Sequence, residues 1–266
     1  MFHKALLSKS MTDHLRGIVG WALGVAAIVV IQLSVYPTIR SSSSDWSSLI
    51  DAFPDAFKEI IRINDYTSET GYLTTELMSF VVPFIFIGLG CSWGARVTTE
   101  DEESGFADIA IALPISRASY LVSRFGASLT VMLITTTSFL TTTIIGARLL
   151  GMSISVSKFL AGGTCLFLLG TLAMSLASLI GSITGARASA LGLSMAFAIG
   201  SFLVYSLAPL VDFLDATMPI NMFDWTIGTT PLFDGFDWAK MMTTAAISMI
   251  CALTTFYFFD KRNISG

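Results

Sequence analysis

Six long apolar stretches dominate this 266-residue chain, and they constrain its fold more than any other feature. A helix needs about 20 apolar residues to cross a bilayer, and each stretch reaches that length without a charge near its middle. Charged residues make up only 13% of the chain, whereas about a quarter is usual in soluble domains. The sequence therefore predicts an all-α integral membrane protein, a single transmembrane domain over 1–266. Its six spans cover about residues 15–36, 72–93, 121–147, 159–182, 188–208 and 238–259.

Basic residues are distributed unevenly between the two sets of connecting segments, and this indicates the orientation. The set that includes both termini contains nine Lys and Arg residues, and the other set contains six. We therefore expect both termini in the cytoplasm and the chain in the inner (cell) membrane. The first span is too long for the core of a signal peptide, and no small-residue cleavage site follows it.

Three segments outside the spans have amphipathic or mixed patterns. Residues 1–14 predict an N-terminal amphipathic helix on the inner leaflet, with a frayed tail as the alternative. Residues 45–63 predict an outer amphipathic helix, kinked or divided at Pro54, that either covers the outer mouth or acts as a substrate lid. Residues 209–237 alternate aspartates with apolar side chains, which favours short interfacial helices with a solvated acidic rim. A calcium site is the alternative, although the spacing matches no EF-hand loop.

The connection between the second and third spans predicts one more helix, over about residues 100–113, too short to cross a bilayer. Thr99 and Glu102 have the spacing of a capping box, and the neighbouring acids favour the positive end of the helix dipole. Pro114 discourages continuation of the helix. An apolar stripe along one face requires either the membrane surface or a groove on a partner protein. The stripe consists of Phe106, Ile109, Ala110 and Leu113.

This connection resembles the loop that follows the second span in six-span permeases of ABC-2 type exporters. In that family an acidic run is followed by a glycine, an Ala-x-Pro and a Ser-Arg pair. The end of the chain, Phe259 to Ile264, also resembles the family's F-x-x-R-D-I ending, although Asn263 replaces the aspartate. The last outer connection is similar as well. The matching residues of the acidic loop are Glu102, Glu103, Gly105, Ala112, Pro114, Ser116 and Arg117, with Tyr120 and Arg124 leading into the third span.

The resemblance implies a permease subunit that pairs with a second permease, expected to be another copy, and binds two cytoplasmic ATPase subunits. Helix 1–14 would be the elbow helix, and helix 100–113 would be the coupling helix that docks on an ATPase. The residues implied in ATPase coupling are Glu100, Glu102, Glu103, Gly105, Phe106, Ile109, Ala110, Leu113, Pro114 and Arg117.

Several motifs of catalysis and ion coupling are missing from the sequence. There is no G-x-x-x-x-G-K-[ST], so we expect that the chain is not an enzyme, holds no cofactor, and relies on a partner ATPase to bind ATP and Mg²⁺. The only histidines, His3 and His14, lie outside the spans, and the three cysteines lie in apolar stretches, so we expect no metal site. The spans also lack the intramembrane charges with which ion-coupled transporters bind their driving ion. A net charge of −4 without a basic patch argues against nucleic acid.

Hydroxyl side chains are concentrated in the third span. Thr135, Ser138 and Thr142 are candidates for lining a mildly polar pathway; alternatively, these hydroxyls bond to carbonyls one turn earlier and join helices. Because the spans contain no basic cluster, we expect a hydrophobic or amphipathic substrate, such as a drug, an antibiotic or a lipid-like molecule. Two other functions stay open: a stand-alone secondary transporter or channel, and a membrane scaffold for a cytoplasmic partner.

Small residues recur in the fourth span and predict close helix packing there. They are Gly162, Gly163, Gly170 and the pair Gly181-x-x-x-Gly185.

Overall fold

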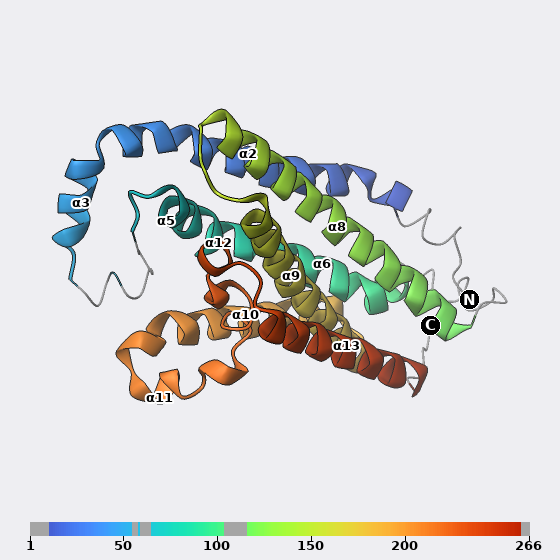
Figure 1. Cartoon of the computed structure of the whole chain (residues 1–266). Coiled ribbons are helices and arrows are strands. Elements are labelled where there is room, and N and C mark those ends of the chain that lie inside the picture. The colour runs from blue at the N-terminus through green and yellow to red at the C-terminus, as the bar shows by residue number, and fades with distance from the viewer. Residues whose placement is uncertain (1–10, 55–57, 59–64, 104–115, 262–266) are drawn as a thin grey trace.

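The computed structural model describes residues 11–54, 58, 65–103 and 116–261, and every regular element in these ranges is helical (Figure 1). Six helices are long and apolar enough to cross a membrane, which confirms the expected all-α membrane fold. The second runs from Glu69 to Glu100 through α5 (Glu69–Leu73), the π-helical turn η1 (Thr74–Met78) and α6 (Val81–Glu103). The others are α2 (Leu15–Ser41), α8 (Arg117–Leu149), α9 (Val156–Thr184), α10 (Arg187–Leu207, extended by η2, Ala208–Leu210) and α13 (Trp238–Lys261).

Shorter helices lie in the connections. The expected outer helix begins as α3 (Ser43–Asp51), which ends three residues before Pro54; most of residues 55–64 lies outside the described residues, as do residues 1–10 of the expected N-terminal helix. The residue before a proline is pushed away from helical geometry, which fits a break near this position. The last connection contains α11 (Asp212–Asp215), η3 (Met218–Ile220), η4 (Ile227–Thr229) and α12 (Pro231–Asp234).

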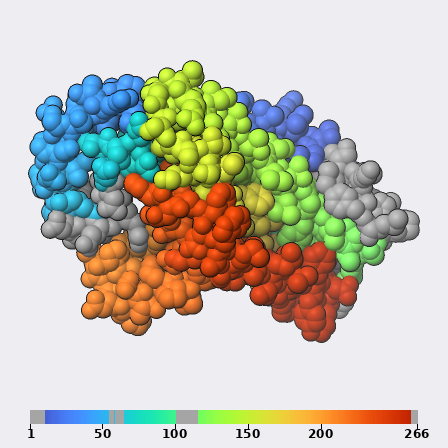
Figure 2. Space-filling view, viewed as in Figure 1, coloured from blue at the N-terminus to red at the C-terminus, as the bar shows by residue number. Residues whose placement is uncertain are grey.

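The helices α6 and α9 form the centre of the bundle, with α2 and α8 on one side and α10 and α13 on the other (Figure 1). The beginning of α2 and the end of α13 lie at one end, called here the terminal end. α3, α5, α11 and α12 lie at the opposite end, called the loop end. From the same side, Figure 2 shows the last connection packed at the loop end while α13 extends toward the terminal end.

Two glycines of α6 allow α9 to approach unusually closely. A Cβ atom placed on Gly90 would lie 2.2 Å from the Gly170 carbonyl oxygen, and one on Gly94 would lie 2.1 Å from the Met174 carbonyl oxygen. Both obstacles are backbone atoms, so no side-chain rearrangement could relieve the contact. Small residues that let two backbones meet are a common way to pack helices in a bilayer. Gly90 and Gly94 therefore form the contact that makes α6 and α9 the core.

The glycines predicted around the fourth span do not all serve packing. Gly162, Gly163 and Gly181 face side chains of neighbouring helices so closely that a Cβ atom would lie 2.8 Å or less from them. Gly185, in contrast, is the C-cap of α9, with a φ of 70° and its N–H bonded to the Gly181 carbonyl. The left-handed conformation favours glycine and ends the helix, so the packing interpretation of Gly185 was wrong.

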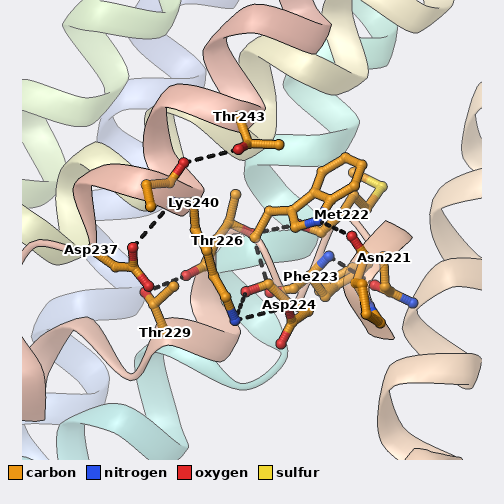
Figure 3. Close-up of polar contacts among 12 residues, drawn as sticks. Asn221, Met222, Phe223, Asp224, Thr226, Thr229, Asp237, Lys240 and Thr243 are labelled. Carbon is orange, nitrogen blue, oxygen red and sulfur yellow. Dashed lines mark hydrogen bonds and ion pairs between the residues drawn. The ribbon is translucent and has the colours of Figure 1, made fainter. Parts of the chain in front are cut away.

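Polar contacts hold the last connection against the bundle (Figure 3). The Lys240 ammonium at the start of α13 forms an ion pair with Asp224 at 2.8 Å. Asp237 accepts a hydrogen bond from the Lys240 backbone N–H at 3.1 Å and so caps α13. Asn221 donates to the Ser201 carbonyl of α10 at 2.9 Å. These contacts favour a structural role for Asp224 and Asp237.

Candidate functional site

Four of the coupling residues predicted from the sequence are described, and they lie at the terminal end of the bundle. Glu100 lies in α6, Glu102 and Glu103 are at the end of the same helix, and Arg117 begins α8. The two helices therefore flank residues 104–115. The other predicted residues lie outside the described residues: Gly105, Phe106, Ile109, Ala110, Leu113 and Pro114.

The predicted capping box at Thr99 was wrong, because α6 continues through this position to Glu103. The Thr99 side chain is fully buried, and its hydroxyl donates to the Ala95 carbonyl one turn earlier at 2.9 Å. Its neighbour Thr98 donates to the Ser178 carbonyl of α9 at 3.4 Å. Packing against α9 outweighs the local capping preference. Residues 100–103, the expected start of the coupling helix, are therefore the last turn of α6.

One carboxylate joins three helices at this end. Glu100 Oε1 lies 2.9 Å from His14 Nε2, at the start of α2, and Oε2 pairs with the Arg124 guanidinium of α8. The side chains are only 17–25% exposed, so water screens these pairs less than it screens pairs on an open surface. We call these three residues the Glu100 clamp.

Aromatic rings surround the clamp. The His14 ring meets Trp93 edge-on, with centroids 5.5 Å apart, and the Arg96 guanidinium lies over the same indole at 5.3 Å. The Arg124 guanidinium lies over the Tyr120 ring at 5.4 Å. Such cation–aromatic contacts are strengthened where water is partly excluded, so they restrict the clamp residues to this arrangement.

The start of α8 is also tied to the end of α13. The Arg117 guanidinium donates to the carbonyls of Phe259 at 3.4 Å and Asp260 at 2.9 Å. The last carbonyls of a helix carry partial negative charge, which a cation stabilises. Stacked ring pairs, Tyr120 with Phe259 and Phe125 with Phe256, extend this contact toward the bundle. The ends of α2, α6, α8 and α13 are therefore connected to one another by side-chain contacts at the terminal end.

The predicted pathway residues lie along α8 but not all in the same environment. Thr135 is fully buried and donates to the Val131 carbonyl one turn earlier at 3.1 Å. Ser138 donates to the Ala22 carbonyl of α2 at 2.8 Å and so joins two helices. Thr142 is half-buried on the same helix. The contacts of Thr135 and Ser138 correspond to the structural alternative, whereas their role in lining a pathway stays a prediction.

A second polar network lies at the loop end, and its carboxylate shows that the expectation of no ionisable side chain within the spans was wrong. Glu76 belongs to the π-helical turn within the spanning helix Glu69–Glu100, and its carboxylate accepts hydrogen bonds from Gln32 of α2 at 2.5 Å and from the Tyr66 hydroxyl at 2.6 Å. The Tyr72 hydroxyl donates to the Gln32 carbonyl at 2.7 Å. An ionisable side chain within a spanning helix and a π-turn are both signals of a functional position. Glu76 is the fifth residue of the expected second span, and an acidic residue at such a position could have indicated this network from the sequence.

Burial raises the pKa of the Tyr66 phenol above its ordinary value, and the hydrogen bond and negative charge of Glu76 raise it further. Tyr66 therefore stays protonated and remains a hydrogen-bond donor at neutral pH. Together Gln32, Tyr66, Tyr72 and Glu76 connect α2 to the beginning of the second spanning helix; we call this set the Glu76 network.

The polar contacts at both ends connect helices of the bundle to one another. Comparison with known proteins identifies the family. A family model described as "ABC-2 family transporter protein" matches residues 4–263, which is nearly the whole chain. No curated protein and no solved structure is significantly similar to it. The chain therefore belongs to the ABC-2 transporter family and is a multi-pass permease subunit of an ABC transporter, a class of membrane protein that associates with ATPase subunits.

Proposed function

We propose that this permease exports a hydrophobic or amphipathic substrate, such as a drug, an antibiotic or a lipid-like molecule. It works as a homodimer with two ATPase subunits, which bind ATP and Mg²⁺ and supply the energy. The terminal end faces the cytoplasm, as the distribution of Lys and Arg favours. The observation that carries the proposal is the Glu100 clamp, because one carboxylate connects α2, α6 and α8 beside the segment that resembles the family's coupling loop.

The helix contacts support a mechanical route for that energy. Closure of the ATPases pushes residues 104–115, which connect α6 to α8. The Glu100–Arg124 pair keeps the flanking ends of these helices together, and His14 adds α2. Since α6 meets α9 backbone to backbone, the two helices move together and do not slide along each other. The resulting tilt opens the pathway between the two permease copies toward the outside.

The coupling role is tested with the permease and its ATPase reconstituted into proteoliposomes. Phe106→Asp and Ile109→Asp place a charge in the predicted apolar stripe, so we expect both to abolish ATP-driven transport and weaken ATPase association while membrane insertion is kept. Glu100→Gln, which weakens the clamp without removing its side chain, is expected to reduce transport per ATP hydrolysed. Asp215→Asn, on an exposed aspartate at the loop end, is the matched control. Normal transport by both stripe variants would contradict the proposal.

One observation favours the alternative of a stand-alone secondary transporter. Glu76 is a carboxylate inside a spanning helix, where ion-coupled transporters bind their driving ion. Gln32 and Tyr66 already occupy its oxygens, which fits a structural role better. Transport in ATP-depleted vesicles under an ion gradient, lost in Glu76→Gln, would establish this alternative. Recovery of the ATPase with the chain but no movement of any solute would instead indicate a scaffold.

A further inference from the structure

An open polar pocket of about 490 Å³ lies at the loop end, where the end of α2, the start of α3, the start of α5 and the turn before α9 converge. Most of its lining side chains carry hydroxyl groups, among them Tyr36, Ser43 and Ser68. The lining also contains one cation, Arg40, and one carboxylate, Glu69.

These two charges share the pocket without forming an ion pair with each other. Within the described part of the chain, Arg40 has no hydrogen-bond or ion-pair partner. Among the residues that the structure describes, Glu69 accepts hydrogen bonds only through Oε2, from the Ser153 backbone N–H at 2.6 Å and from the Ser153 hydroxyl at 3.0 Å. The pocket therefore presents separated positive and negative groups with capacity to bind.

The position of Arg40 places the pocket at the depth of lipid head groups. Arg16 and Arg40 are the only charged residues of α2. The 24 steps along the chain from Arg16 to Arg40 correspond to roughly 36 Å of helix at about 1.5 Å per residue, slightly more than the hydrocarbon thickness of about 30 Å. Arg40 therefore lies just beyond the hydrocarbon region, where a phosphate and an amine of a zwitterionic molecule are both available.

We propose that this pocket binds a zwitterionic group that combines a phosphate with a primary ammonium, as in phosphoethanolamine. The phosphate bonds to the Arg40 guanidinium, whose planar set of donors matches phosphate oxygens, and nearby hydroxyls complete its contacts. The ammonium pairs with Glu69 Oε1. The site differs from the coupling end and does not depend on the proposed direction of transport, since binding is measured on the full chain without its ATPase.

The test uses the full-length chain in nanodiscs made of phosphatidylglycerol, which contain no zwitterionic lipid. Binding of soluble phosphoethanolamine is measured by equilibrium dialysis and compared with binding of inorganic phosphate and of ethanolamine. We expect phosphoethanolamine to bind at least about tenfold more tightly than either fragment, because each fragment satisfies only one of the two charges. Equal affinity for phosphate and phosphoethanolamine would overturn the proposal, and this comparison needs no variant.

Two conservative variants assign the charges. Arg40→Gln is expected to weaken phosphoethanolamine binding about tenfold or more, and Glu69→Gln is expected to remove its advantage over inorganic phosphate. The matched controls are Arg148→Gln, an exposed arginine in the last turn of α8 that does not line the pocket, and Asp215→Asn. Thermal unfolding shows that each variant is folded. Unchanged phosphoethanolamine binding in folded Arg40→Gln and Glu69→Gln would overturn the assignment of these two residues to the ligand. An equal loss of binding in the two control variants would overturn it as well.

A last arm distinguishes a lipid head group from a free molecule as the natural source. The nanodiscs are rebuilt with equal parts of phosphatidylethanolamine and phosphatidylglycerol. Loss of soluble phosphoethanolamine binding would show that the bilayer lipid occupies the same site. Unchanged binding would support the zwitterionic pocket but identify a soluble phosphorylated amine as its ligand.

Discussion

The two ends of the second spanning helix each carry one glutamate that joins helices, yet they do so with different partners. At the terminal end, Glu100 contacts the imidazole of His14 and the guanidinium of Arg124. At the loop end, Glu76 accepts hydrogen bonds from two neutral groups, the Gln32 amide and the Tyr66 phenol. The first arrangement includes an ion pair between two charged side chains, and the second consists of hydrogen bonds from neutral groups beside the rings of Tyr66 and Tyr72; both sets of side chains are partly buried.

The difference suggests which end is built to move. Attraction between partly exposed charges weakens gradually with distance, so the Glu100 clamp can follow a displaced coupling segment. Hydrogen bonds depend steeply on distance and angle, and a partly buried donor that is left without its acceptor is costly. Tyr66 and Tyr72 also pack on each other, with ring centroids 5.5 Å apart. We therefore expect the loop end to stay rigid while the terminal end transmits movement.

The largest effect is expected from Gly94→Leu, because this substitution would separate α6 from α9. Without that contact the bundle would not fold, and neither end of the second spanning helix would keep its partners. The added side chain would meet the Met174 backbone, so we expect a loss of about 3 kcal/mol or more and no folded bundle. Folded yield by size-exclusion chromatography measures this. Gly24→Leu on α2, where a Cβ atom meets nothing within 4 Å, is the control and should remain folded.

Removing the two glutamates individually tests whether the loop end is the more rigid. Glu76→Ala leaves the Gln32 amide and Tyr66 hydroxyl without their acceptor and is expected to cost about 2 kcal/mol. Glu100→Ala is expected to cost about 1 kcal/mol, because His14 and Arg124 keep their contacts with the rings of Trp93 and Tyr120 when the carboxylate is removed. Thermal unfolding in the same detergent compares them. A greater loss for Glu100→Ala would reverse the assignment of the two ends.

The two ends are also expected to differ in how strongly their coupling energies depend on salt concentration. In double-mutant cycles, the coupling between Glu100 and Arg124 is expected to fall by several tenths of a kcal/mol between about 0.1 and 1 M NaCl, since ions screen partly exposed charges. The coupling between Gln32 and Glu76 should change less, because one partner is uncharged. Equal salt sensitivity of both pairs would show that the two ends do not differ in this way.

The smallest effect concerns pH and is confined to the loop end. The pKa of Tyr66 is raised in the folded protein, so its contribution to stability is complete below the unfolded pKa, near 10. This contribution decreases as the pH rises further, because only the unfolded chain releases the proton. Tyr66→Phe is expected to make stability less sensitive to pH between about 9.5 and 11, whereas Tyr257→Phe, an exposed tyrosine at the other end, is the control. Identical pH slopes in the wild type and Tyr66→Phe would contradict this assignment.

Much of the fold could be predicted because span length and polarity are properties of continuous segments. The apolar stretches predicted the six spanning helices. Pro54 predicted a break in the outer helix, and α3 ends at Asp51, shortly before that proline. The candidate site was harder to predict. Thr99 and Glu102 have the spacing of a capping box, which predicts the start of a new helix. Thr98 and Thr99 instead pack near α9, and α6 continues through both positions. Glu76 was passed over because one acid near the end of an apolar stretch resembles an ordinary boundary.

The sequence by itself determined the helical class, the number of spans and the family of this permease. Only the tertiary structure decided that α6 and α9 form the core, that Gly90 and Gly94 bring them together, and that Glu100 and Glu76 join opposite ends to α2. The reason is that lipid and protein interior are both apolar. Hydropathy therefore identifies a spanning segment but does not distinguish its buried face from its lipid face, and only the packing of other helices makes that distinction.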